Sequence, residues 1–211
     1  VPVDFPEGVR HLVLFEYAAG QPHSTLTIDD AALMGVMLAR LHKTLDRFES
    51  PYRRFDLDET FLIDEPLRYL RQVPEVTGQD LPFLESLVPS LKATMQMLPR
   101  TPETFAPIHG DYWWSNVHFD GQGLTLFDFD FCGSGWRLYD IATFQGTARA
   151  NGFTWSGDVV DAFLEGYESV RALTDIERGA LRDFESIRVI WALGLAASRR
   201  RVNGDRWFAE F

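Results

Sequence analysis

The chain has 211 residues, of which 45% are hydrophobic, and a net charge of −11 at pH 7. This length and composition are enough for one domain, or two small ones, with a substantial apolar core. The acidic balance argues against nonspecific nucleic-acid binding, which needs Lys and Arg to neutralise phosphates, and it weakly favours a neutral or cationic partner. The sequence has no run of about 18 apolar residues, which is the length that would indicate a transmembrane helix. We therefore expect no membrane partner either.

The chain contains a single cysteine, Cys132. A lone cysteine excludes an internal disulfide and suits a reducing compartment, so we expect a cytoplasmic protein. The N-terminal sequence VPVDFPEGVR has no apolar signal core. Because the first residue is not Met, we expect a trimmed or partial chain.

The first predicted elements are a strand and a helix. Residues 11–17, HLVLFEY, are apolar and aromatic and are followed by AAGQP, which is typical of a strand and a turn. Residues 27–48 place apolar side chains at helical spacing, and Thr27 with Asp30 three residues later predicts an N-cap. His42 lies in this helix, and we interpret it as a packing residue.

The middle of the chain is less regular. Residues 50–80 mix Pro with charged residues and predict loops with a short helix. A second helix is expected over residues 81–98, where Pro89 predicts a break or a kink. The loop TPETFAP then leads into two short strands, SNVHF and LTLFDF, joined by the turn DGQG.

The tail that follows CGSG is predicted to be mostly helical. Ser156 is a candidate N-cap for one helix. Thr174 and Glu177 form a predicted capping box for a longer helix that runs towards Arg201. A strand, helices, a small hairpin and further helices together predict an α+β domain that is mostly α.

The most informative stretch is HGDYWWSNVHFDGQGLTLFDFDF, which begins at His109. Asp111 follows HG, Asn116 comes five residues later, and Asp128 follows the apolar strand LTLF. Charge beside apolar strands is costly unless it is paired or binds a metal. A phosphoryl acceptor needs a carboxylate to take its proton, and Mg²⁺ prefers carboxylate and amide oxygens. The spacing resembles the catalytic loop of kinases, H-x-D-x-x-x-x-N, with a metal-binding Asp after the next strand.

The wider pattern HGD…N…DFD…G…YDIA resembles the aminoglycoside phosphotransferase family, which includes choline, homoserine and related small-molecule kinases. The resemblance covers nearly the whole chain from Leu12 onwards. It implies a protein-kinase-like fold, in which a small β-hairpin of the helical C-terminal lobe carries the catalytic and metal residues. It also implies ATP as co-substrate, Mg²⁺ as cofactor, and a small hydroxyl-bearing acceptor such as an aminoglycoside, an amino alcohol or a sugar.

The resemblance implies a role for each residue that matches the family motif. Asp111 would be the catalytic base, and Asn116 and Asp128 would hold Mg²⁺. His109 would shape the catalytic loop without reacting. Asp140, in LYDIA, would hydrogen-bond the backbone of that loop.

Other residues of the region keep two interpretations. Asp130 is either a second metal ligand or a group that orients the substrate. Trp113 and Trp114 either pack or line the acceptor cleft, and packing is the simpler interpretation. Acidic residues of the tail slightly favour a cationic acceptor, although a solvated helix face explains them as well; they are Asp175, Glu177, Asp183 and Glu185.

The segment LFEYAAG also resembles part of the family pattern, the connector between the two kinase lobes. The Glu16 carbonyl and the Ala18 N–H would pair with adenine, and Phe15 would lie against its ring. An ordinary strand and turn is the alternative. Residues 1–20 would then be the connector and adenine-binding segment, and residues 21–211 the helical lobe.

The front of the kinase pattern is missing. Kinases cover the phosphates with a Gly-rich loop and contact them with a Lys. This chain has no G-x-G-x-x-G, and its two lysines, Lys43 and Lys92, both follow the connector. We therefore expect that the N-terminal lobe is absent from this chain. The alternatives are a non-catalytic kinase-like binding module, a kinase that acts on protein Ser/Thr, and a metal-dependent phosphatase, which needs more clustered His and Asp ligands.

Overall fold

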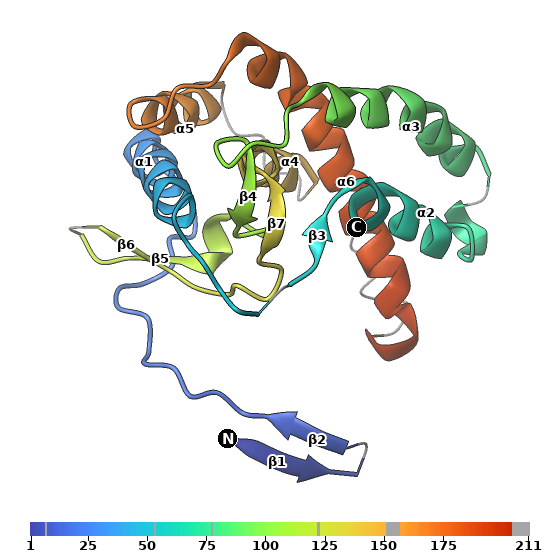
Figure 1. The fold of residues 1–211 in the computed structure, drawn as a ribbon, viewed down its shortest axis with the longest axis horizontal. Helices are drawn as coiled ribbons and strands as arrows, with labels where there is room; N and C mark the ends of the chain where they lie inside the picture. Colours follow the sequence, from blue (N-terminus) through green and yellow to red (C-terminus); the bar gives the residue numbers. More distant parts are fainter. Residues whose placement is uncertain (7, 53, 77, 122, 151–156, 204–211) are drawn as a thin grey trace.

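The computed structural model describes residues 1–211 except 7, 53, 77, 122, 151–156 and 204–211. Most of the described chain forms a helix-rich body with small sheets, which confirms the predicted α+β class. Strands β1 (Pro2–Phe5) and β2 (Gly8–His11) form an antiparallel hairpin that lies apart from this body, at the lower edge of Figure 1.

The helices of the body pack largely in pairs (Figure 1). One pair is α1 with α5, and α6 packs against both α2 and α4. The bounds of these helices are α1 Ile28–Leu45, α2 Glu65–Leu70, α4 Arg137–Ala150, α5 Gly157–Glu168 and α6 Asp175–Asn203.

Two glycines allow α1 and α5 to approach each other closely. A Cβ on Gly35 of α1 would lie 2.0 Å from the Phe163 carbonyl oxygen, and a Cβ on Gly166 of α5 would lie 2.2 Å from that of Ala32. Atoms cannot approach this closely, so both positions need glycine. The resulting close packing fixes the position of α1 behind the predicted catalytic loop.

The predicted helix caps are present where the structure describes them. The Thr27 hydroxyl accepts the Asp30 N–H at 3.1 Å, while the Asp30 carboxylate accepts the Thr27 N–H at 3.0 Å. Thr174 and Glu177 form the same reciprocal contacts ahead of α6. Both predicted caps are therefore confirmed, whereas Ser156 lies outside the described residues.

Two strands of the central sheet were predicted as loops. The sheet has the order β3-β7-β4, with β3 (Asp56–Leu57) parallel and β4 (Phe105–Ile108) antiparallel to β7 (Gly133–Trp136). The loop interpretation was thus wrong for the end of TPETFAP, where β4 forms, and for the part of residues 50–80 that forms β3. Glycine disfavours strands, but a Cβ on Gly133 would lie 2.5 Å from the Phe55 carbonyl oxygen, so close packing selects glycine in β7.

The second small sheet is the predicted hairpin. Strands β5 (Val117–Phe119) and β6 (Leu124–Leu126) pair antiparallel, with Val117 opposite Leu126. The turn is closed by the Gly123 N–H, which donates to the Asp120 carboxylate at 2.7 Å. The hairpin is confirmed, although β6 ends earlier than the predicted LTLFDF.

Four helical segments of the described chain remain. They are the π-helix η1 (Thr60–Asp64), the short 3₁₀ helices η2 (Pro74–Val76) and η3 (Trp114–Asn116), and α3 (Asp80–Met97). Two of them, η1 and α3, pack against α6. Helix α3 continues through Pro89, because this residue is exposed and water can satisfy the backbone carbonyl that proline leaves unpaired. In the part of the chain that the structure describes, no helix combines the length and apolar character needed to span a membrane.

The strand predicted over residues 11–17 is not formed beyond His11. Leu12 still exchanges backbone hydrogen bonds with Val1, but residues 13–17 are in no strand. A strand needs a neighbouring strand to satisfy its backbone groups, and the described residues offer none to this segment. The apolar side chains point outwards, with Leu14 98% and Phe15 81% exposed.

Candidate active site

Asp140, on the first turn of α4, is the anchor of the HGD loop. Its Oδ2 accepts the His109 N–H at 2.8 Å, and its Oδ1 accepts the Gly110 N–H at 2.7 Å. Gly110 has φ +81°, and a Cβ there would lie 2.1 Å from the Phe131 carbonyl oxygen. The loop therefore requires glycine between the His and the Asp, and the Asp140 carboxylate holds its backbone in place.

The His109 side chain is buried and connects the loop to the end of β6. Its Nδ1 lies 3.2 Å from the Asp111 N–H, which donates to it, so the ring proton is on Nε2. That Nε2 lies 3.1 Å from the Phe127 carbonyl oxygen. A neutral imidazole satisfies both contacts, and His109 is in a position to shape the loop.

Asp111 and Asn116 contact each other directly. The Asn116 Nδ2 donates to the Asp111 carbonyl oxygen at 2.9 Å and to its Oδ2 at 3.2 Å. These contacts fix the amide plane and direct its NH₂ group towards Asp111. The amide oxygen, which accepts the Ser115 hydroxyl at 3.4 Å, therefore remains on the side away from Asp111.

The hairpin brings Asn116 close to the segment that contains Asp128. The Phe127 N–H donates to the Asn116 carbonyl oxygen at 3.1 Å, and Asp128 is the next residue. Asp128 has φ +62°, and no other described non-glycine residue has a positive φ. A left-handed backbone costs roughly 1–3 kcal/mol and is found most often at functional sites. The exposed Asp128 carboxylate and the Asn116 amide oxygen form a donor set that suits a hard cation.

The structure does not separate the two interpretations of Asp130. Its carboxylate is exposed, like that of Asp128, and its carbonyl oxygen accepts the Arg54 guanidinium at 2.5 Å. Among the described residues, no three His, Cys, Asp or Glu side chains gather into a metal-binding cluster. An ion held at Asn116 and Asp128 would therefore take its other ligands from a nucleotide or from water.

Arg188 of α6 is a site residue that the sequence did not reveal. Its Nη2 donates to the Asp111 Oδ1 at 2.6 Å, although the two residues are 77 positions apart. Its side chain is 8% exposed and that of Asp111 is 18% exposed. No local motif marks Arg188, because it is one of several arginines along an amphipathic helix.

His42 of α1 completes the support of Asp140. Its Nε2 lies 3.1 Å from the Asp140 Oδ2, and its Nδ1 lies 2.9 Å from the Tyr167 hydroxyl. Burial lowers the pKa of His42 to about 4, although Asp140 opposes this shift. Burial works to raise the pKa of the Asp140 carboxyl, but contacts with His42 and His109 bring it below its ordinary value. The packing histidine of the sequence prediction is thus a neutral hydrogen-bond donor to the anchor of the loop.

The predicted connector lies beside the β5–β6 hairpin. The Ala18 carbonyl oxygen lies 3.1 Å from the His118 Nδ1, and Gln21 forms a backbone bridge with Phe119. Glu16 and Phe15 are exposed to solvent. The segment is therefore tied to the hairpin at its C-terminal end, and its adenine-binding role stays a prediction.

The tryptophans and the acidic tail residues have structural contacts. Trp113 and Trp114 stack with their ring centroids 6.0 Å apart, and Trp114 packs on the core. Glu177 caps α6, Asp183 accepts the Thr94 hydroxyl, and Glu185 is buried. Glu177 and Glu185 are buried and Asp183 is paired, so these three carboxylates do not form a solvated helix face, whereas Asp175 is exposed. The preference for a cationic acceptor stays a prediction.

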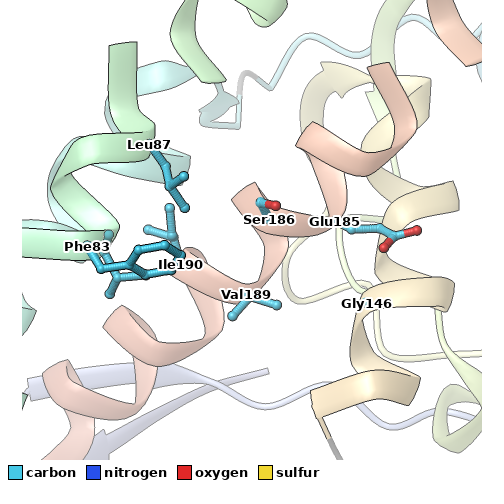
Figure 2. A pocket seen from close by; sticks show the side chains of 8 residues that line it. Phe83, Leu87, Gly146, Glu185, Ser186, Val189 and Ile190 are labelled. Atoms are coloured by element: carbon cyan, nitrogen blue, oxygen red, sulfur yellow. The ribbon is translucent and has the colours of Figure 1, made fainter. Parts of the chain in front are cut away.

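Two pockets lie beside α6. One, of about 180 Å³, lies between η1, α2 and α6, and its wall contains Phe131 and Trp191. The Trp191 ring also faces the Arg188 guanidinium at 4.6 Å, so Arg188 links a wall residue of this pocket to Asp111. The other, of about 250 Å³, opens between α3 and α6, where Figure 2 shows Phe83, Leu87 and Ile190 facing one another.

The chain matches the model of the phosphotransferase enzyme family over residues 3–183. It is 34% identical over 202 residues to an uncharacterized protein of Synechocystis, which covers 90% of this chain and 53% of that protein. It is 34% identical over 222 residues to an uncharacterized protein of Deinococcus radiodurans, and this match covers 99% of this chain and 62% of that protein. It is 27% identical over 180 residues to a homoserine kinase of Zymomonas mobilis, and this match covers 81% of this chain and 53% of that protein. The chain thus spans 53% to 62% of the length of these relatives.

Solved structures with the same fold include two small-molecule kinases. A microcompartment-associated aminopropanol kinase is 24% identical with a TM-score of 0.83, covering 100% of this chain and 68% of that one. An amicoumacin kinase, solved with AMP-PNP, Ca²⁺ and its substrate, is 20% identical with a TM-score of 0.72 (92% and 62% coverage). At these identities the similarity shows that the chain has their fold.

Proposed function

Since the chain belongs to the phosphotransferase enzyme family, we propose that the protein containing it transfers the γ-phosphate of ATP to a hydroxyl group of a small molecule. The observation that carries this proposal is the arrangement around Asp111. A partly exposed carboxylate is held on both oxygens, by Arg188 at 2.6 Å and by Asn116 at 3.2 Å, on a loop anchored by a buried aspartate. Fixed geometry of this kind is what phosphoryl transfer requires of a protein.

Asp111 is the proposed base. Its carboxylate accepts the proton of the acceptor hydroxyl as the oxygen of that group attacks the phosphorus. His109 does not compete for this role, because both of its ring nitrogens are already engaged within the loop. Asp140 contributes by holding the loop backbone and has no contact with the side chain of Asp111 among the described hydrogen bonds.

Asn116 and Asp128 are the proposed Mg²⁺ ligands. The Asn116 amide hydrogens are used by Asp111, which leaves its oxygen for a cation. Asp128 supplies an exposed carboxylate on a left-handed backbone, one residue after the Phe127 N–H that is bonded to Asn116. When bound, Mg²⁺ neutralises charge on the phosphate oxygens. We retain Asp130 as a second ligand or substrate-orienting group.

The acceptor is proposed to enter the pocket beside Trp191. A volume of about 180 Å³ holds a compound of a few heavy atoms, such as an amino alcohol, and is at the lower end of ligand sites. This size favours a small acceptor over a protein Ser/Thr side chain or a three-ring aminoglycoside. The names of the related aminopropanol and homoserine kinases point in the same direction.

Residues 1–20 are proposed as the interlobe connector, with the Glu16 carbonyl and the Ala18 N–H facing adenine and Phe15 against its ring. The phosphate-covering loop and lysine would then belong to an N-terminal lobe outside this chain. The free thiol of Cys132 suits the cytoplasm.

Asp111→Asn in the intact protein tests the proposal. General-base groups contribute about 10²–10⁴-fold, so we expect kcat to fall by this order while ATP affinity stays unchanged. ADP formation is followed with Mg²⁺-ATP and aminopropanol, homoserine or kanamycin as acceptor, and phosphorylated product is identified by mass spectrometry. The matched control is Asp158→Asn, an exposed aspartate on α5. Unchanged turnover in Asp111→Asn would rule out the assignment of the base.

A further inference from the structure

Arg188 is a buried cation that α6 contributes to the catalytic loop. Arg188 is 7% exposed. Its Nη2 donates to the Asp111 carboxylate, and its guanidinium also faces the ring of Trp191. Burial opposes its charge, yet Tyr139 and Asp111 hold the pKa of Arg188 above its ordinary value. Arg188 therefore stays a cation in its buried position.

This ion pair is a poor way to stabilise a fold. Removing two charges from water costs about as much as their attraction returns, so buried pairs add little net stability. Among the described residues, no group meets hydrogen-bond geometry with the buried Nε and Nη1 atoms of Arg188, and the nearby Tyr139 stabilises the charge electrostatically. An apolar side chain would fill the same space at lower cost, which indicates that the charge at this position serves the loop.

The Arg188 side chain leaves α6 facing Gly146 of α4, where an added Cβ would lie 3.6 Å from its Cγ, an ordinary van der Waals distance. Figure 2 shows Gly146 facing the turn of α6 that contains Glu185, Ser186 and Val189. The guanidinium itself is held by two contacts, with the Trp191 ring at 4.6 Å and with the Asp111 carboxylate.

We propose that Arg188 is a positioning residue that sets the orientation of the Asp111 carboxylate, an inference that rests on the proposed role of Asp111 as the base. Arg188 holds Oδ1 through a short charge-assisted hydrogen bond, the stronger kind. The Asn116 amide holds Oδ2 at 3.2 Å, which is longer and weaker. Oδ2 is therefore the oxygen that exchanges its contact for the proton of the acceptor hydroxyl, while Oδ1 stays fixed.

Lysine cannot replace this contact. The planar guanidinium fork of arginine fixes direction as well as distance, whereas the lysine ammonium is a rotating point charge. A base displaced by about 1 Å costs on the order of 10²-fold in rate. We therefore expect Arg188→Lys to keep the charge and the fold but to lower kcat by about 10²-fold, with the KM for ATP unchanged.

The test compares Arg188→Lys, Asp111→Asn and the double variant in the intact protein. ADP formation is measured with Mg²⁺-ATP and the best acceptor among 1-amino-2-propanol, L-homoserine and kanamycin. If none of these is phosphorylated, the hydrolysis of ATP, with water as the acceptor, is measured instead. Since Arg188 acts through Asp111, the double variant should be no slower than Asp111→Asn alone. Millimolar guanidinium should also restore part of the activity of Arg188→Ala. The matched control is Arg182→Lys, an exposed position on the same helix, which should leave kcat unchanged.

The outcomes separate the two proposals. Wild-type kcat in Arg188→Lys, or losses that multiply in the double variant, would overturn the positioning role and leave Asp111 as the base. Wild-type kcat in Asp111→Asn would overturn the proposed function itself, and the positioning role with it. A KM increase for ATP without a change in kcat would also contradict the positioning role.

Discussion

Acid should destabilise this fold through the buried histidine of α1, His42. His42 donates its Nε2–H to Asp140 and accepts the Tyr167 hydroxyl with Nδ1, so its imidazole must be neutral to make both contacts. Its side chain is fully buried, and burial lowers its pKa to about 4. Because Asp140 in turn holds the HGD loop, this protonation connects the pH to the geometry of the candidate site.

The sign follows from the proton balance. The pKa of His42 is below the ordinary value of 6.5, so between these values the unfolded chain binds a proton that the folded chain does not. The contribution of His42 to the free energy of unfolding is thus complete above about pH 6.5 and is lost as the pH falls towards about 4. At roughly 1.4 kcal/mol per pH unit, this window corresponds to about 3 kcal/mol.

Urea unfolding of wild type and His42→Gln between pH 4 and 8 measures this contribution. The free energy of unfolding of the wild type should decline with a slope of up to about 1.4 kcal/mol per pH unit more than that of His42→Gln. Its control is His23→Gln, at an exposed histidine on the segment before α1, which should keep the wild-type slope. NMR titration of labelled histidines reports the His42 pKa directly. Equal slopes in wild type and His42→Gln, or a His42 pKa near 6.5, would refute the reasoning.

Two further predictions concern the ligands. Asp128→Ala should weaken Mg²⁺-nucleotide binding, measured by calorimetry, far more than Asp130→Ala, because Asp128 directly follows Phe127, whose N–H is bonded to the Asn116 backbone. The reverse order would assign the metal to Asp130. Leu195→Trp, which narrows the pocket beside Trp191, should raise the acceptor KM and leave the ATP KM unchanged. The matched control is Val189→Trp, in the pocket of Figure 2, which should change neither KM. A larger rise of the acceptor KM in Val189→Trp would assign the acceptor to that pocket instead.

Features determined by neighbouring residues were predictable from the sequence. The cap at Thr27 follows from side chains three positions apart, and the hairpin follows from two β-rich runs around DGQG. The HGD…N…D spacing indicated the residues that the structure brings together at the end of this hairpin. Their catalytic and metal-binding roles stay predictions, to be tested by the substitutions above.

Features determined by distant packing were not predictable. Strand β7 contains glycines because Phe55 and Ile108 leave no room for a side chain. From the sequence alone, such glycines favour a loop over a strand. The segment after His11 has the composition of a strand but no neighbouring strand among the described residues. Arg188 is 77 positions after Asp111 in the sequence, with several helices and strands between them, so only the fold reveals their contact.

The candidate catalytic loop therefore depends on the helical body in a way that its motif does not express. Helix α1 supports it through His42, α4 through Asp140 and α6 through Arg188, and each of these side chains is buried. A chain with the same HGD spacing but without the α6 arginine would keep its loop backbone, because Asp140 holds that backbone independently. Its Asp111 carboxylate would nevertheless keep only the longer contact with Asn116, so the spacing by itself does not fix the orientation of this carboxylate.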